Sequence, residues 1–139
     1  MEVSKEKLKE IVDQLDFGFK VFININSQEI VSFPDEDQGF DIDPVWQDEV
    51  AKVRKNKKAY FEIEPLTSRE SYEIMESFIG TIKDEHISAV LLQAIEGRKP
   101  FANFNHQIHQ LDAEKKEWFE FKESQLMEYV RNQLKLQGS

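Results

Sequence analysis

The chain has 139 residues, enough for one domain that buries roughly two thirds of the surface its unfolded chain would expose. It contains no cysteine, which excludes a disulfide framework, thiol catalysis and cysteine-based zinc or iron–sulfur sites. Its formal net charge of −9 opposes contact with phosphate backbones, so we expect no nucleic-acid partner.

The composition, 40% hydrophobic and 32% charged, is typical of a globular protein with a charged surface. The amino terminus lacks the apolar core of a signal peptide, and the apolar runs are too short to cross a bilayer. We therefore expect a cytoplasmic protein without membrane contact. Residues 52–58 read KVRKNKK, with five cations, and directly follow the acidic segment 34–49. Opposite charge blocks this close in sequence are expected to neutralise one another or to be solvated.

The chain begins with the pattern of a helix followed by a β-hairpin. Ser4 is placed to cap a helix whose apolar residues are spaced for one face. Those residues are Leu8, Ile11, Val12 and Leu15. Apolar alternation over 17–25, a polar turn at 26–28 and a second apolar run at 29–33 then predict the hairpin.

A second helix and a third strand follow. Asp43 and Pro44 are the residue types preferred at an N-cap and at the first helical position, so a helix is predicted to begin there. One side of it carries Trp46, Val50 and Val53. Residues 59–64 predict a strand that Pro65 ends.

From Thr67 onward the pattern is helical. Thr67 and Glu70 form a capping box. The helix that follows has an apolar face of Tyr72, Met75, Phe78, Ile79 and Ile82. Asp84 is placed to cap the next helix, and Gly97 to end it as a C′ glycine.

Two further helices carry aromatic residues three positions apart. Pro100 suits the first turn of one helix, and Asp112 is placed to cap a long last helix. The rings are Phe101 and Phe104 on the first helix, and Trp118 and Phe121 on the second. Residues three apart share a helix face, and a short connection makes antiparallel neighbours. We therefore interpret these rings mainly as a packing seam.

Together the elements predict an α+β fold, with a small antiparallel sheet (hairpin plus a third strand) and a mainly helical C-terminal half of about four helices. We expect a single domain over residues 1–139, with an α/β-hairpin portion at 1–66 and a helical portion at 67–137.

Three motifs in the helical portion occur in a recognisable order. They are Tyr72-x-x-Met75-Glu76-x-Phe78-Ile79, Leu91-x-x-Ala94-Ile95-x-Gly97-Arg98-Lys99-Pro100-Phe101-x-x-Phe104, and Trp118-Phe119-x-Phe121. Over about residues 59–134 the chain resembles uncharacterised protein family 0158, a family of unknown function. The resemblance implies an antiparallel sheet with a helical C-terminal half, and it implies no activity.

The chain departs from this family's pattern around residue 105. The family tends to have a Lys directly after the second Phe of the second motif, where this chain has Asn105. The neighbouring cations are replaced by Ala102 and Asn103. If the family's block contacts an anion, this chain should be impaired in that contact.

No metal site is predicted. His106 and His109 are three residues apart on a helix, but a metal needs a third ligand and supporting groups. The acidic run 35–43 resembles part of a calcium loop, yet Phe40 and Trp46 stand where that loop requires Gly and Glu.

No catalytic residue or cofactor is predicted either. Glu73 and Glu76 are one helical turn apart, and we interpret them as a solvated face. The chain has no G-x-S-x-G, P-loop or G-x-G-x-x-G motif. The sequence thus favours a protein without enzymatic activity but leaves an enzyme open.

The most notable polar pair is Arg98 and Lys99, between the end of one helix and the start of the next. Cations there complement the negative end of the preceding helix by about 0.3–1 kcal/mol. Alternatively, Arg98 and the first amides of the 100–111 helix form an anion pocket beside Phe101. The candidate binding residues are Arg98, Lys99, Phe101, Phe104, Asn105 and Trp118.

The sequence leaves three functions open. The first is a non-enzymatic intracellular protein-interaction module, with the acidic segment 35–49 and the helix-junction cations as its surface and another protein as its partner. The second is a binder of small anionic ligands, or an enzyme, with a cleft near Arg98. The third is an acidic inhibitor or immunity-type protein directed at a basic enzyme. The sequence predicts no oligomeric state.

Overall fold

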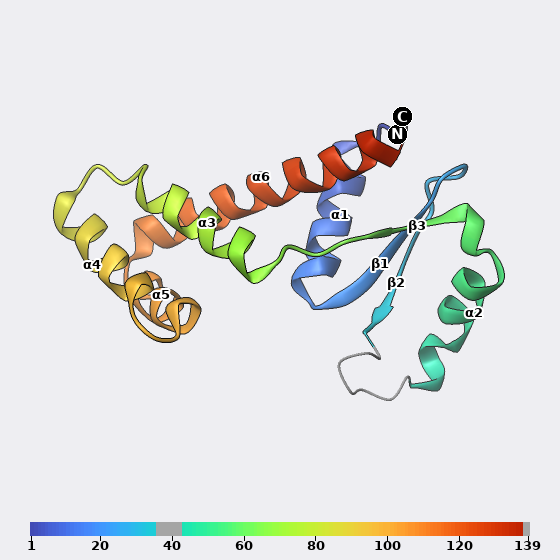
Figure 1. Ribbon diagram of the computed structural model, residues 1–139, viewed down its shortest axis with the longest axis horizontal. Helices are drawn as coiled ribbons and strands as arrows, with labels where there is room; N and C mark the ends of the chain where they lie inside the picture. The colour runs from blue at the N-terminus through green and yellow to red at the C-terminus, as the bar shows by residue number, and fades with distance from the viewer. Residues whose placement is uncertain (36–42, 138–139) are drawn as a thin grey trace. The chain divides into compact units, whose positions relative to one another are not determined.

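The computed structural model describes residues 1–35 and 43–137 (Figure 1). The chain forms two compact units. Unit 1 comprises Met1–Pro65 with Leu126–Ser139, and unit 2 comprises Leu66–Gln125. Residues 126–137 are helical, as expected, and they belong to unit 1. The expectation that the whole chain acts as one domain stays a prediction.

Unit 1 contains a three-stranded antiparallel sheet with strand order β2-β1-β3. The strands are β1 (Phe19–Asn24), β2 (Ile30–Pro34) and β3 (Tyr60–Ile63). In the central strand, Val21 pairs with Ser32 on one side and Ile63 on the other. The predicted hairpin and third strand are therefore present.

The first strand is shorter than the 17–25 run suggested. Phe17 is the C-cap of helix α1 (Lys5–Asp16), and its side chain is 76% exposed. Gly18 follows with a φ of +82°, a conformation that glycine adopts without steric cost. The apolar alternation begins at Phe17, but Phe17 and Gly18 form the turn that ends α1, so the strand begins only at Phe19.

Successive residues of β1 face opposite sides of the sheet. Val21 and Ile23 are both 0% exposed on one face. Ser32 shares this face, and its hydroxyl donates a hydrogen bond to the side-chain Oε1 of Gln14 in α1 at 3.1 Å, so α1 covers this face. Helix α1 begins as predicted, because the Ser4 hydroxyl accepts a hydrogen bond from the Lys7 amide.

The other face is covered by helix α2 (Gln47–Lys55), which is preceded by the 3₁₀ helix η2 (Pro44–Trp46) and followed by η3 (Lys57–Ala59). Asp43 caps η2 as predicted, accepting a hydrogen bond from the Val45 amide at 3.0 Å. The buried cluster between helix and sheet consists of Val31, Phe33, Val50 and Val53, with Phe22, Trp46 and Tyr60 packed around it.

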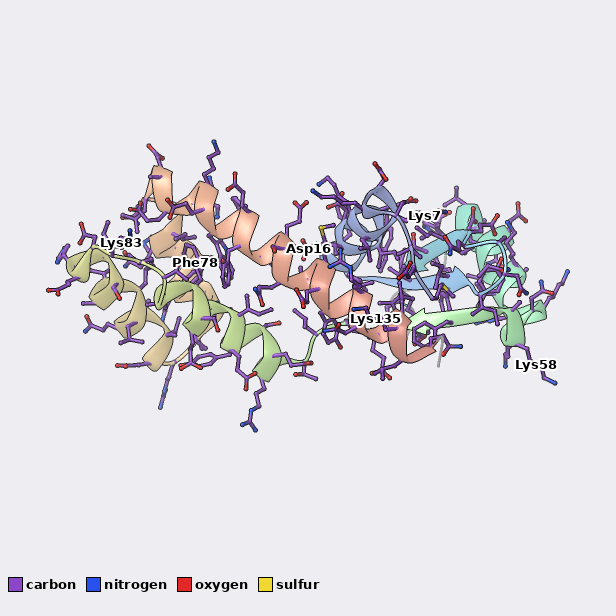
Figure 2. The ribbon with its side chains drawn as sticks, turned by 90° about the horizontal axis from the view of Figure 1, so that it is seen from above. Lys7, Asp16, Lys58, Phe78, Lys83 and Lys135 are labelled. Carbon is purple, nitrogen blue, oxygen red and sulfur yellow. The ribbon has the colours of Figure 1, made fainter. Side chains whose placement is uncertain are left out.

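Unit 2 is helical. It contains α3 (Ser68–Ile79), α4 (Glu85–Glu96), α5 (Pro100–Ile108) and the first part of α6 (Asp112–Gln137). The capping box of Thr67 and Glu70 is present, and Asp84 caps α4. Figure 2 shows Phe78 among these helices, and its side chain is 2% exposed. The buried core is Met75, Phe78, Ile79, Leu91, Ile95, Phe104, Ile108 and Trp118.

Three details of unit 2 differ from the sequence prediction. Gly97 has a φ of −93°, and the left-handed residue after α4 is Lys99, with a φ of +56°. Asp112 is the first residue of α6 and not a cap before it. Phe104 is 0% exposed, whereas Phe101 is 38% exposed and so is only partly in the seam.

The α+β fold with a helical C-terminal half is confirmed by the three strands and by the helices α3 to α6. Across residues 1–35 and 43–137, none of the helices combines the length and apolar character needed to cross a membrane.

Candidate functional site

Unit 2 contains a hollow between α3, α5 and α6, which we call the α3–α5–α6 pocket. Its volume is about 230 Å³. Its apolar lining is Leu66, Ile74, Met75, Phe101 and Trp118, and its polar lining is Ser68, Ser71, Asn105 and Lys122. Met75 and Trp118 are 3% and 6% exposed, so they form the floor of the pocket.

Each helix contributes an apolar residue and a polar residue one turn apart. On α5 these are Phe101 and Asn105, and on α6 they are Trp118 and Lys122. Ser71 and Met75 have the same spacing on α3. Residues four apart lie above one another on a helix face, so the three pairs converge on the hollow.

The floor is held in place by ring contacts. The Trp118 ring lies 4.8 Å from that of Phe104 at 69°, and 5.3 Å from that of Phe78. Phe121 also contacts Phe78, at 5.5 Å. These edge-to-face and tilted arrangements are the ones that aromatic quadrupoles favour. The rings predicted as a seam therefore pack together, and Trp118 also lines the pocket.

The polar lining offers hydrogen bonds to a ligand. Within the part of the chain that the structure describes, the side chains of Ser68, Ser71 and Asn105 have no hydrogen-bond partner. Lys122 is partly buried and adds a cation. The nine lining residues include no carboxylate, imidazole or thiol, so a general base of those types is not among them. The arrangement is suited to binding a largely apolar group.

The structure separates the six candidate binding residues into three sets. Phe101, Asn105 and Trp118 meet at the pocket, and Phe104 is buried beneath it. Arg98 and Lys99 are exposed and are not among the lining residues. Binding by any of the six stays a prediction.

The side chain of Asn103 hydrogen-bonds to the end of α4 and to the segment that connects α4 to α5. Its side-chain amide donates to the carbonyl of Arg98 at 2.7 Å and to that of Ala94 at 3.3 Å. Such bonds satisfy carbonyls that have no partner at a helix C-terminus. Asn103 stands where the family tends to have a cation, and in this chain its side chain makes these two structural contacts.

Sequence reasoning missed Ser68, Ser71 and Lys122. A signal for Lys122 was present, because it lies one turn after Trp118, as Asn105 lies one turn after Phe101. The two serines lie on α3, and no local pattern connects that helix to the other two.

The remaining candidates lie elsewhere. His106 is exposed and is 3.0 Å from the side chain of Gln110. Glu73 forms an ion pair with Arg69 at 3.3 Å. Among residues 1–35 and 43–137, no group of three or more His, Cys, Asp or Glu residues is placed to hold a metal ion.

A stretch of the acidic segment, residues 36–42, lies outside the described residues. Its two flanking carboxylates have structural contacts. Asp35 is 3.8 Å from the ammonium of Lys20, and Asp43 caps η2.

Unit 1 contains a carboxylate and an ammonium group whose pKa values are shifted. The carboxylate of Glu29 accepts hydrogen bonds from Lys52 at 3.0 Å and from the Tyr60 hydroxyl at 2.9 Å. The Lys52 bond, followed by that of Tyr60, lowers the pKa of Glu29, since both stabilise its charged form. The same hydrogen bond with Glu29 raises the pKa of Lys52. Lys52 belongs to α2 and Tyr60 to β3, and the ion pair of Lys52 with Glu29 is exposed to solvent.

The comparison with known proteins agrees with the motifs. A family model described as Uncharacterised protein family (UPF0158) matches residues 4–138. The chain belongs to this family. A UPF0158 protein of Pseudomonas aeruginosa is 28% identical over 68 residues, which cover 49% of this chain and 44% of that relative. The UPF0158 chain therefore aligns with less than half of that relative's length. No solved structure matches it significantly.

Membership in UPF0158 confirms the resemblance found in the three motifs. The family's description and the relative's name state no activity. The function of this UPF0158 chain has to be argued from the geometry of its own sites.

Proposed function

We propose that this UPF0158 chain is a non-enzymatic, cytoplasmic protein-interaction module whose α3–α5–α6 pocket receives one hydrophobic side chain of its partner. The observation that carries this proposal is a small, open hollow with an apolar floor and a polar rim. The absence of cysteine suits a reducing compartment.

The size of the pocket favours a single side chain. Pockets for drug-sized ligands have about 300–1,000 Å³, and an apolar cavity of about 150 Å³ is able to hold benzene. The volume of about 230 Å³ lies between these values. Binding energy at protein interfaces is concentrated in aromatic or aliphatic anchors that fill such pockets.

The polar residues of the pocket are suited to binding the partner's backbone on either side of the inserted hydrophobic side chain. The hydroxyls of Ser68 and Ser71 and the amide of Asn105 are able to pair with the partner's backbone groups. Lys122 favours an acidic residue next to the anchor, since opposite charges attract across a partly desolvated contact. The partner's segment is therefore expected to combine a large apolar side chain with a neighbouring Asp or Glu.

The alternative of a small anionic ligand near Arg98 has less support. Arg98 is exposed at the α4–α5 connection, and the cation that lines the pocket is Lys122. An anion held beside Phe101 would thus meet Lys122 and the two serines. The inhibitor hypothesis rests on net charge, and no feature of the pocket favours it.

The test is selection of displayed random peptides on the full chain, followed by affinity measurement of the enriched peptides. We expect them to share one aromatic or large aliphatic residue beside an acidic residue. Binding should change the fluorescence of Trp118, which is isolated as the single tryptophan by Trp46→Phe.

Two matched variants locate the contact. Ser71→Phe should fill the pocket and abolish binding, because Ser71 lines it. Ser77→Phe adds the same ring to an exposed position of α3 outside the lining and should leave binding unchanged. Selected peptides that bind Ser71→Phe as tightly as the unmodified chain would show that the pocket is not the anchor site.

A further inference from the structure

Unit 1 also contains a hollow, on the sheet face against which α2 packs. We call it the α2–sheet pocket. Its volume is about 260 Å³. It is lined by Lys20, Phe22, Phe33, Val53, Arg54, Lys57, Tyr60 and Glu62. All of these residues belong to unit 1, so the pocket is independent of the one proposed to bind a protein partner.

One side of this pocket is aromatic. Phe22 of β1 stacks on Phe33 of β2, with ring centroids 5.5 Å apart and an interplanar angle of 22°. Tyr60 of β3 is on the same sheet face, and its hydroxyl is fixed by the hydrogen bond to Glu29. Phe22 and Tyr60 are partly exposed. Aromatic rings on a sheet face are the surfaces on which nucleic-acid bases stack, and every base has a π-face to offer.

Three further lining residues are cationic. Arg54 comes from α2, and Lys57 from η3. Lys20 of β1 also lines the pocket and lies 3.8 Å from Asp35, and Arg54 likewise interacts with another group of the chain. The two other cations at the end of this block, Lys55 and Lys58, are exposed and do not line the pocket. Figure 2 shows Lys58 extending away from unit 1.

Glu62 is the carboxylate among the lining residues, and it influences where in the pocket an anionic group binds. Glu62 lies on β3, where it pairs with Phe22 of β1. It repels a negative group, so a phosphate is favoured beside Arg54 and Lys57 and an uncharged ring beside the sheet. Guanidinium and ammonium groups are the side chains that bind phosphate in proteins.

We propose that the α2–sheet pocket binds a free nucleoside monophosphate. The base stacks on Phe22 and Tyr60, and the phosphate contacts Arg54 and Lys57. A free nucleotide is favoured over a nucleic-acid strand, because the net charge of −9 repels a polyanion while two or three local cations suffice for one phosphate.

Glu62 also predicts which base is preferred. A carboxylate accepts a hydrogen bond from an exocyclic amino group such as N4 of cytosine. Adenine carries an amino group as well, whereas uracil carries only carbonyl oxygens in its place. CMP and AMP should therefore bind more tightly than UMP.

The first experiment is calorimetric titration of the full chain with CMP, AMP, UMP and ribose 5-phosphate. Loss of one stacked base typically weakens binding by about fivefold or more, so ribose 5-phosphate should bind at least that much more weakly than CMP. A six-residue oligodeoxycytidine is titrated in parallel at several salt concentrations. If it binds far more tightly than CMP, with a steep salt dependence, the ligand is a strand and the proposal of a free nucleotide is wrong.

The second experiment uses charge-matched variants. Arg54→Gln and Lys57→Gln should each weaken CMP binding by roughly tenfold, since each removes a charge-assisted hydrogen bond. Lys55→Gln and Lys58→Gln remove the same charge outside the pocket and should change affinity by less than about twofold, the effect of a screened surface charge. Equal losses in both pairs would overturn the proposal, because they would show attraction to the basic block as a whole.

The stacking contact is tested by NMR on the unmodified chain and by a substitution of Phe22. Addition of CMP to the unmodified chain should shift the ring-proton NMR signals of Phe22 and Tyr60, and Phe22→Leu should weaken binding with its far-UV circular dichroism unchanged. No saturable binding of any of the three nucleotides to the unmodified chain, or shifts confined to residues outside the pocket, would refute the site.

Discussion

The strongest stability prediction concerns Phe104, which is 0% exposed in the core of unit 2. Its ring makes edge-to-face contacts with Trp118 at 4.8 Å and Phe78 at 6.5 Å. Each such pair contributes about 0.5–1.5 kcal/mol beyond the burial of area. Phe104→Leu keeps an apolar side chain but removes both contacts, so it should lower the free energy of unfolding of unit 2 by about 1–3 kcal/mol.

Phe101→Leu is the matched control. Phe101 lies one turn earlier on the same helix, is 38% exposed and takes part in none of the ring contacts among the described residues. Its replacement should cost less than about 0.5 kcal/mol, as is usual for positions outside a core. The same substitution should weaken binding of the selected peptides, because Phe101 lines the pocket.

Urea unfolding is followed by Trp118 fluorescence in the Trp46→Phe background, so that the signal comes from a residue of unit 2. A lower midpoint with an unchanged slope shows lost stability. A double-mutant cycle of Phe78→Leu and Phe104→Leu should give a coupling energy of about 0.5–1.5 kcal/mol. If Phe101→Leu destabilises unit 2 as much as Phe104→Leu does, the distinction between seam and pocket is wrong.

Three further predictions concern local contacts. Lys52→Met should raise the pKa of Glu29 in an NMR titration, because the hydrogen bond that lowers this pKa most is lost. Glu29 stabilises the fold above its unfolded pKa, and this contribution disappears as pH falls through its lowered folded pKa. An unchanged titration of Glu29 would refute the assignment. Thr67→Ala should cost about 0.5–2 kcal/mol in thermal unfolding by removing half of the capping box, and a neutral result would exclude the cap. Gly97→Ala should increase the free energy of unfolding by about 0.4–1 kcal/mol, because Gly97 has a negative φ and an added Cβ meets no atom within 4 Å. A lower free energy of unfolding would show that a glycine is required at this position.

The elements that the sequence predicted well are those specified by neighbouring residues. The capping box at Thr67 involves residues three apart, and the hairpin depends on alternation on either side of a short turn. Such signals are local and need no knowledge of the rest of the fold. The exposure of Phe101 could not be read in the same way, since Phe101 and Phe104 have equivalent spacing and differ only in what packs against them.

Both pockets depend on which elements meet in space. Ser71 and Lys122 are 51 positions apart in the printed sequence and share a lining only because α3 and α6 flank the same hollow. Likewise, KVRKNKK shows five cations, but only the packing of α2 on the sheet determines that Arg54 and Lys57 line a pocket while Lys55 and Lys58 do not. The spacing within one helix indicates a face, and the partner of that face comes from the tertiary structure.

The departure from the family pattern at Asn105 yields the last prediction. Asn105 lines the α3–α5–α6 pocket, so a Lys at this position would add a second cation beside Lys122. Asn105→Lys should therefore strengthen binding of the selected acidic peptides by about 1.4- to 5-fold, the range expected for one exposed ion pair of 0.2–1 kcal/mol. The effect should decrease with added salt.

Ala102→Lys is the control for this change. Ala102 is exposed, lies on the same helix and does not line the pocket. If Ala102→Lys strengthens binding as much as Asn105→Lys, the gain comes from the reduced net charge of the chain and not from the pocket. A gain confined to Asn105→Lys, lost again in combination with Ser71→Phe, would mean that the residue after the second Phe sets how acidic a partner this pocket selects.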